Sequence, residues 1–499
     1  MRRLWALLTT SSALLSCAVA LVGFVWGWVI SGPAWAEGIN WDTASYVALY
    51  ASGQGSPLDL PWNSHYALGP IYALAGAVAR ACGGTWVDGV RLACASAMAA
   101  AAFCFATFAQ LRTGPAGVVW GLLYVASWGV SRLALTLEDN VLYLPFACAA
   151  VLLALHHADA WSWRLSLIAA VLVAGGALVS WQAGLYLFPA LYVAAFVGGK
   201  ARSWQTRAKE VAITLATFVG TCVIFVLLFR MLSSRNSLAT LLHTLFSRPS
   251  PSFFPRSLHD LVTLFSDQRV FAQVAAGVCA QVSAGRAACT ALSASLGLII
   301  AVLVTAAVIF SLVRARATSR WRGHVAWISF AAIFVATALY VDLPDDHYKR
   351  YEFIPLFVCV AGLLGMERAA KVPLVALRMA VAVSVVLSAW GTLAQARTYR
   401  RNLPETTPPG YLGRGDEPWF VYFRRLRHEH PSACLFTLRL DDSLLHGRYQ
   451  LEIPAALWSE LPAHQLVGFP GAMRDWPRKV NVVAPSALPP ARACEWRSL

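Results

Sequence analysis

Three clusters of acidic residues lie beside the apolar stretches of this chain. The first contains Asp42, which is flanked by Trp41 and Tyr46. Aromatic residues gather at the water interface of membranes, where a carboxylate is partly desolvated and poised to accept a proton. A plainer interpretation makes Asp42 the N-cap of a short helix that begins at Thr43. Asp42 is therefore a candidate general base, with helix capping as the alternative.

The second cluster is Thr136-Leu137-Glu138-Asp139-Asn140. Its two adjacent carboxylates and its amide suit three roles: orienting the hydroxyls of a sugar, holding a divalent cation, or capping the next helix from Asp139. The sequence does not choose among these three roles.

The third cluster occupies residues 342–351 and ends just before Pro355. It combines carboxylates, an imidazole, two cations and a tyrosine: Asp342, Asp345, Asp346, His347, Lys349, Arg350 and Tyr351. A single histidine such as His347 is more typical of a solvated loop than of a ligand. The density of charged groups in so short a segment nevertheless favours a binding role over solvation alone.

The elements that must position these clusters are membrane helices. Hydrophobic residues make up 58% of the chain, charged residues 13%, and the mean hydropathy is +0.57, whereas soluble domains carry about 25% charged residues. The net charge of +15 comes from basic residues scattered in short clusters between apolar runs. Nucleic acid is therefore not an expected partner, and membrane lipids are.

We expect an all-α polytopic membrane protein with about eleven transmembrane helices, because each crossing needs roughly 17 to 25 apolar residues. The expected spans are 5–31, 88–110, 115–131, 141–157, 164–180, 183–199, 211–231, 288–313, 324–341, 353–367 and 373–396.

Counting these spans from a cytoplasmic N-terminus puts the basic junctions on the cytoplasmic side, as the positive-inside rule requires. The basic residues of these junctions are Arg112, Arg164, Lys200, Arg202, Arg207, Lys209, Arg314, Arg316, Arg320, Arg322, Arg368 and Lys371. All three acidic clusters and the C-terminus then fall outside a plasma (inner) membrane. A cleaved signal peptide ending at Ala36 is the alternative for the N-terminus, although its apolar region is longer than the usual 7 to 15 residues.

The sequence predicts two domains, a multi-span domain over 1–396 and an extracytoplasmic C-terminal domain over 397–499. A linker rich in proline opens the second domain, and residues 433–440 have the pattern of a strand, which indicates a small α/β or β-rich fold. Cys434 and Cys494 are expected there, either as a disulfide or as two free thiols. The segment 247–255, rich in proline and phenylalanine, is expected to form an outer loop and not a span.

No Walker or Gly-rich phosphate loop and no C-x-x-C spacing occurs in the sequence. ATP-driven transport is therefore unsupported, and the cofactor is unknown, with a divalent cation as the open possibility.

Taken in order, these motifs resemble those of the GT-C superfamily of membrane glycosyltransferases, which take a sugar from a polyprenyl-phosphate carrier on the outer face. The resemblance covers residues 1–396. It rests on the positions of an acidic first loop, His65-Tyr66-Ala67-Leu68-Gly69-Pro70-Ile71-Tyr72, Val90-Arg91-Leu92, Leu137-Glu138-Asp139-Asn140, Trp181-Gln182-Ala183-Gly184-Leu185-Tyr186 and Lys349-Arg350-Tyr351-Glu352-Phe353-Ile354-Pro355-Leu356.

The resemblance implies an inverting transfer of a hexosyl or pentosyl group to an envelope glycan, lipid or protein. It implies that Asp42 is the general base and that Arg350, with Lys349, binds the carrier phosphate. The other residues that it assigns to substrate binding are Glu138, Asp139, His65, Asp345, His347 and Tyr351. The chain departs from the family in having a lone acid in the first loop and a single proline near His65, which leaves metal dependence open.

Two other classes of protein remain as alternatives. Transporters and flippases usually carry ionisable residues near the bilayer midplane, whereas Asp88, Arg91, Glu210, Arg230 and His324 lie near the ends of their expected spans. A non-catalytic scaffold for envelope assembly would leave the acidic loops as caps and solvated turns.

Overall fold

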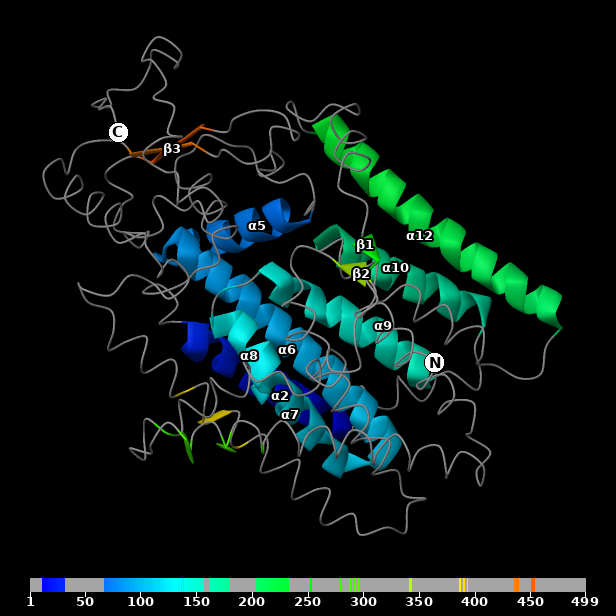
Figure 1. Cartoon of the computed structure of the whole chain (residues 1–499), viewed down its shortest axis with the longest axis horizontal. Coiled ribbons are helices and arrows are strands. Elements are labelled where there is room, and N and C mark those ends of the chain that lie inside the picture. Colours follow the sequence, from blue (N-terminus) through cyan, green and yellow to red (C-terminus); the bar gives the residue numbers. More distant parts are fainter. Residues whose placement is uncertain are drawn as a thin grey trace, which may run out of the picture.

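Helices make up all the long elements in the described part of the chain, as a computed structural model shows (Figure 1). The structure describes residues 11–31, 67–135, 137, 139–156, 162–179, 203–232, 252–253, 279, 287–288, 291–292, 295, 341–342, 386, 389–390, 393, 435–438 and 450–453.

Two long antiparallel helices pack against each other in the described bundle. They are α2 (Ser11–Ser31) and α6 (Trp86–Thr113), which match the expected spans 5–31 and 88–110. By length and composition, these are the two described helices that qualify as membrane spans. A 21-residue helix such as α2 rises about 30 Å, the thickness of the hydrocarbon core.

Small residues allow α2 and α6 to pack closely. Gly23 and Gly27 are four residues apart on one face of α2, and each faces small or flexible residues of α6. A methyl group at Gly27 would lie 2.9 Å from Met98 Sδ, and one at Gly23 would lie 3.1 Å from Ala102 Cβ. Helices in lipid associate mainly through such close packing, because burial from lipid gives little hydrophobic gain.

The helix α5 (Leu68–Ala81) precedes α6 and packs against it, and it was not predicted from the sequence. Its 14 residues extend only about 21 Å, too short for a crossing. The chain reverses at Gly83, whose φ of 81° suits glycine, and Gly84 N donates to Ala79 O at 2.8 Å. A side chain at Gly76 would collide with the ring of Trp86, so the two helices cross at this glycine.

The expected span 115–131 is not one helix. A 3₁₀ turn (η1, Pro115–Gly117) leads into α7 (Val118–Ala126), and α8 (Trp128–Leu135) follows after a break. Ser127 causes the break, because its ψ of 146° is extended and its hydroxyl donates to Tyr124 O at 2.6 Å. The prediction of a continuous span was therefore wrong here.

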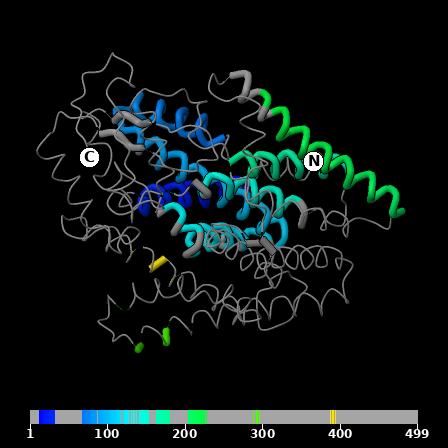
Figure 2. Tube along the Cα trace, turned by 45° about the horizontal axis from the view of Figure 1, so that its top comes forward, coloured from blue at the N-terminus to red at the C-terminus, as the bar shows by residue number. Residues whose placement is uncertain are grey.

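The next helices agree with their expected spans. A 3₁₀ helix (η2, Asp139–Tyr143) leads into α9 (Leu144–His156), followed by α10 (Trp163–Val179) and α12 (Trp204–Leu232). In Figures 1 and 2, α12 runs along the outside of α10, at the periphery of the bundle. The exposed side chains of α12 are largely apolar, as lipid-facing residues are: Leu215, Val219, Val223, Ile224 and Leu227.

Two small antiparallel strand pairs complete the described elements. β1 (Ser252–Phe253) pairs with β2 (Val341–Asp342), and β3 (Leu435–Leu438) pairs with β4 (Gln450–Ile453). The strand predicted over 433–440 is therefore confirmed, whereas the C-terminal domain around it stays a prediction. The spans expected at 183–199, 288–313, 324–341, 353–367 and 373–396 lie wholly or mostly outside the described residues.

Candidate active site

The helix ends that flank the acidic clusters gather at one end of the bundle. Trp28, in the last turn of α2, contacts Arg91 near the start of α6. Ala67 N, just before α5, donates to Leu178 O at 3.0 Å near the end of α10. η2 packs against both α6 and α10. We call this the acidic end, defined by Ser31, Ala67, Trp86, Asp139 and Val179.

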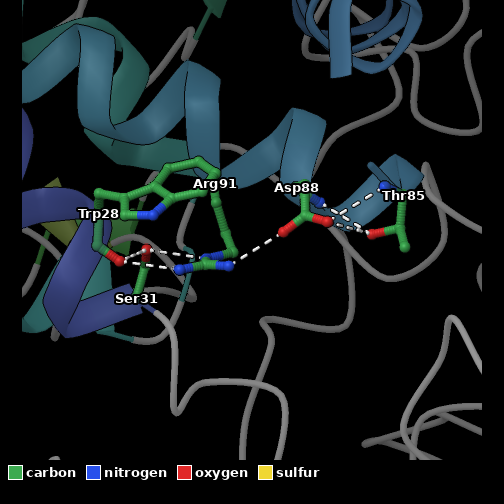
Figure 3. Close-up of polar contacts among 5 residues, drawn as sticks. All are labelled: Trp28, Ser31, Thr85, Asp88 and Arg91. Atoms are coloured by element: carbon green, nitrogen blue, oxygen red, sulfur yellow. Dashed lines mark hydrogen bonds and ion pairs between the residues drawn. The ribbon is translucent and has the colours of Figure 1, made fainter. Parts of the chain in front are cut away.

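At the acidic end, Arg91 joins α2 to α6 (Figure 3). Its Nη2 donates to Trp28 O at 3.0 Å, and its Nε lies 3.5 Å from Ser31 Oγ. The guanidinium carbon lies 4.1 Å from the centroid of the Trp28 ring, in cation–π contact. Trp28 O belongs to the last turn of α2, whose carbonyls lack helical partners, so Arg91 caps α2 with a positive charge at the negative end of its dipole.

Asp88 connects this contact to the start of α6. Its Oδ2 accepts from Thr85 N at 3.1 Å and from Thr85 Oγ1 at 3.0 Å, while Asp88 N donates to Thr85 Oγ1 at 3.2 Å. These bonds form a capping box. Asp88 Oδ1 accepts from Arg91 Nη1 at 2.9 Å. We refer to Thr85, Asp88, Arg91, Trp28 and Ser31 as the Arg91 clamp.

A strained turn carries the second acidic cluster to the same end. Leu137 is fully buried and has a φ of 52°, a left-handed conformation that costs a non-glycine residue about 1–2 kcal/mol. Burial of its side chain offsets this cost. The neighbouring break between α7 and α8 is tied to α2, because Trp26 Nε1 donates to Ser131 Oγ at 2.9 Å and Ser131 Oγ donates to Val125 O at 2.9 Å. The start of α8 is thereby fixed relative to α2.

The strand pair β1–β2 joins the proline-rich loop to the third acidic cluster. Ser252 pairs with Asp342 and Phe253 pairs with Val341 in antiparallel register. Ser252 and Phe253 therefore adjoin the first residue of the cluster at 342–351. The side of the membrane on which this strand pair lies stays a prediction.

Comparison with known proteins identifies the fold. No protein-family model and no curated protein sequence matches the chain. Among solved structures, the crystal structure of ArnT from Cupriavidus metallidurans bound to undecaprenyl phosphate matches with a TM-score of 0.51 and 15% identity, covering 88% of this chain and 84% of that chain. The chain has the fold of ArnT.

A second match is the cryo-EM structure of the arabinofuranosyltransferase AftD from Mycobacteria, with a TM-score of 0.41 and 16% identity. It covers 85% of this chain and 29% of AftD. At that TM-score the likeness supports nothing by itself. The ArnT match shows the fold alone, which agrees with the fold that the resemblance implies and is that of a polytopic membrane protein.

Within this ArnT fold, the structure describes one of the predicted site residues, Asp139, and only its backbone. Asp139 is the first residue of η2, and its role as a cap or as a binding residue stays a prediction. The other predicted residues lie outside the described ranges: Asp42, His65, Glu138, Asp345, His347, Lys349, Arg350 and Tyr351. The described residues that flank them in the chain do lie at the acidic end: Ser31 and Ala67 flank the segment with Asp42 and His65, and Leu137 and Asp139 flank Glu138.

The described part of the chain contains no group of three His, Cys, Asp or Glu side chains able to hold a metal ion. The acidic clusters fall mostly outside that part, so a divalent cation held by them stays a prediction. Cys279 is disulfide-bonded, and it lies between the expected spans 211–231 and 288–313, in a stretch that the count of spans places outside the membrane. A disulfide suits the oxidising compartment that this placement requires.

The Arg91 clamp was not predicted from the sequence. The contact between Thr85 and Asp88 could have been predicted. Thr85-Trp86-Val87-Asp88 before an apolar run has the Ser/Thr-x-x-acid spacing of a capping box. The contact of Arg91 with Trp28 depends on how α2 and α6 pack, and no local pattern records that packing.

Proposed function

We propose that this chain is an integral membrane glycosyltransferase that moves a sugar from a polyprenyl-phosphate carrier to an envelope glycan, lipid or protein. The observation that carries the proposal is the match over 88% of the chain to ArnT, whose structure holds undecaprenyl phosphate. The gathering of helix ends at the acidic end also supports the proposal. A carrier too apolar to leave the bilayer must meet its polar acceptor at one membrane surface.

In the proposed reaction, the acceptor hydroxyl attacks the anomeric carbon of the donor sugar. Asp42 takes the proton of that hydroxyl as the new glycosidic bond forms, and the bond between the sugar and the carrier phosphate breaks with inversion. Arg350, with Lys349 and Tyr351, binds the phosphate and stabilises the negative charge that develops on it. A phosphate is a good leaving group, so positioning and one base suffice.

The other candidate residues have binding roles in this proposal. Glu138 and Asp139 orient sugar hydroxyls from the turn at Leu137. His65 lies in the chain just before α5, and Asp345 and His347 belong to the segment that starts at β2, so we place them around donor and acceptor. The C-terminal domain over 397–499 lies on the same side.

The described helices support an enzyme over an ion-coupled transporter. Asp88 and Arg91 pair with each other at the start of α6, while Arg207, Lys209 and Glu210 lie in the first turns of α12. Ion-coupled transporters need ionisable residues near the middle of their spans. The ionisable side chains that the structure describes are instead near helix ends.

We propose that the acidic end faces outward from the plasma membrane and that the N-terminus is cytoplasmic. In a background that lacks reactive native thiols, Leu60→Cys is expected to react with a membrane-impermeant thiol reagent added to intact cells. Trp204→Cys, at the exposed start of α12, is expected to react only after permeabilisation. Labelling of Trp204→Cys in intact cells would reverse the proposed orientation, because Arg207 and Lys209 would then lie outside.

Deletion of the encoding gene tests the proposed function in the cell. We expect mass spectrometry of the envelope to show the loss of one sugar from a glycan, lipid or protein. The polyprenyl-phosphate-linked form of that sugar should accumulate, since its consumer is gone. Restoration by the wild-type chain is the control. An unchanged envelope and an unchanged pool of lipid-linked sugars in the deletion strain would contradict the proposal.

A further inference from the structure

We infer that Arg91 is a positioning residue for catalysis: by fixing the end of α2 against the start of α6, it sets where the first outer loop, which carries Asp42, begins. This inference rests on the proposed function, because it takes Asp42 as the base. Arg91 itself is not placed in contact with substrate.

The geometry of Arg91 explains how one side chain can fix a helix end. Its guanidinium is planar, and three of its nitrogens point to three different groups: Nη1 to Asp88 Oδ1 at 2.9 Å, Nη2 to Trp28 O at 3.0 Å and Nε towards Ser31 Oγ at 3.5 Å. The Trp28 ring covers one face of the guanidinium. A group held along its edges and against one face has little freedom to rotate, and the Arg91 side chain is only 14% exposed.

The charges at the clamp favour this arrangement over other pairings. The negative end of the α2 dipole lies at Trp28 and Ser31, and the positive end of the α6 dipole lies at Thr85. Asp88 complements the start of α6, and Arg91 complements the end of α2. Because Asp88 also accepts from Arg91, the cap of one helix is coupled to the cap of the other.

The end of α2 matters because the loop with Asp42 starts directly after Ser31. A general base must lie within hydrogen-bond reach of the proton that it takes. Misplacement by about 1 Å costs up to roughly 100-fold in rate. Loss of the Arg91 contacts would free the last turn of α2, and with it the start of that loop, while the phosphate-binding residues around Arg350 belong to a different segment.

The main alternative is that Arg91 only holds the two helices together. The chain offers a matched control for this alternative, because a second polar contact joins the same helices at their opposite end. There, Ser16 Oγ of α2 accepts from Gln110 Nε2 at 2.7 Å and from Thr107 Oγ1 at 3.0 Å. Gln110 is buried, so its loss should weaken the α2–α6 contact without reaching the loop that follows Ser31.

The experiment compares Arg91→Ala, Arg91→Lys and Gln110→Ala with the wild type. Each is purified in detergent and supplied with the polyprenyl-phosphate-linked sugars and acceptors extracted from the membranes of the source cells. The thermal midpoint, kcat and the KM for the lipid donor are measured. Hydrogen–deuterium exchange of residues 32–45 gives a readout that does not depend on activity.

We expect Arg91→Ala to lower kcat roughly 10- to 100-fold with little change in the donor KM, and to speed exchange in residues 32–45. Arg91→Lys should recover part of the kcat, because lysine keeps the charge but offers no planar fork. Gln110→Ala should lower the thermal midpoint while leaving kcat and the exchange of residues 32–45 close to wild type.

Equal losses of kcat in Arg91→Ala and Gln110→Ala would overturn the inference, as would unchanged exchange in residues 32–45 of Arg91→Ala. If Arg91→Ala does not fold, Arg91→Lys decides, because full activity and unchanged exchange in that variant would contradict the need for a fork. A wild-type protein that transfers no sugar would refute the proposed function instead. The exchange comparison would then still show whether Arg91 orders the loop.

Discussion

Asp42→Asn is expected to lower glycosyl transfer by roughly 100-fold or more, the scale of losing general-base assistance. Asparagine has nearly the size of aspartate and caps helices about as well. It does not accept a proton from the acceptor hydroxyl at neutral pH. The variant should therefore insert and unfold like the wild type while its turnover collapses. The measurement is the rate of sugar transfer by purified protein, beside its thermal midpoint.

Asp59→Asn is the matched control, because Asp59 belongs to the same expected outer loop and has no assigned role. It should keep near-normal turnover. If Asp42→Asn has wild-type stability and undiminished turnover, Asp42 is a helix cap and not the base. Glu138, Asp139 and Asp345 would then be the next acids to test.

Arg350→Ala is expected to raise the KM for the lipid donor severely, because the carrier phosphate loses its principal partner. Arg350→Lys should recover the donor KM only in part, since lysine offers a point charge in place of a planar fork with two parallel hydrogen bonds. The measurement is donor saturation at a fixed, high concentration of acceptor.

Arg368→Ala provides the comparison for Arg350, because Arg368 belongs to a junction expected on the cytoplasmic side. Its donor saturation should match the wild type. If both Arg350 variants also saturate with donor as the wild type does, Arg350 does not bind the carrier phosphate, and the third acidic cluster has another role.

The membrane helices were largely predictable from the sequence, because apolar composition determines them. α2, α6, α9, α10 and α12 each overlap an expected span. The lengths of α2 and α6 suit the thickness of the bilayer, and a helix satisfies its backbone hydrogen bonds within itself. Local composition is enough for such a prediction.

The elements that depend on tertiary contacts were not predictable in the same way. α5 has too few residues for a span, and it packs on α6 through the contact between Gly76 and Trp86. No proline marks the break at Ser127 in the sequence. Ser131, four residues further on, accepts a hydrogen bond from Trp26 of α2. Both features depend on partners that are distant in sequence.

In the candidate site, too, local sequence features were predictable and tertiary contacts were not. The types and order of the acidic and basic residues were readable from the sequence, and they led to a resemblance with which the ArnT-like fold agrees. The contacts that fix the helix ends were not readable from the sequence, because Arg91 and Trp28 are 63 residues apart. Their contact follows from the packing of Gly23 and Gly27 against α6. The roles of Asp42 and Arg350 stay predictions for the experiments above.

The most direct test of the account follows the lipid donor itself. Purified protein is reconstituted in liposomes with extracted polyprenyl-phosphate-linked sugars and acceptors, and the lipids are followed by mass spectrometry. The account predicts that the sugar-loaded carrier disappears and free polyprenyl phosphate appears with the wild type and not with Asp42→Asn. A carrier whose mass stays unchanged with folded wild-type protein would contradict the account, and movement of the intact carrier between leaflets would identify a flippase instead.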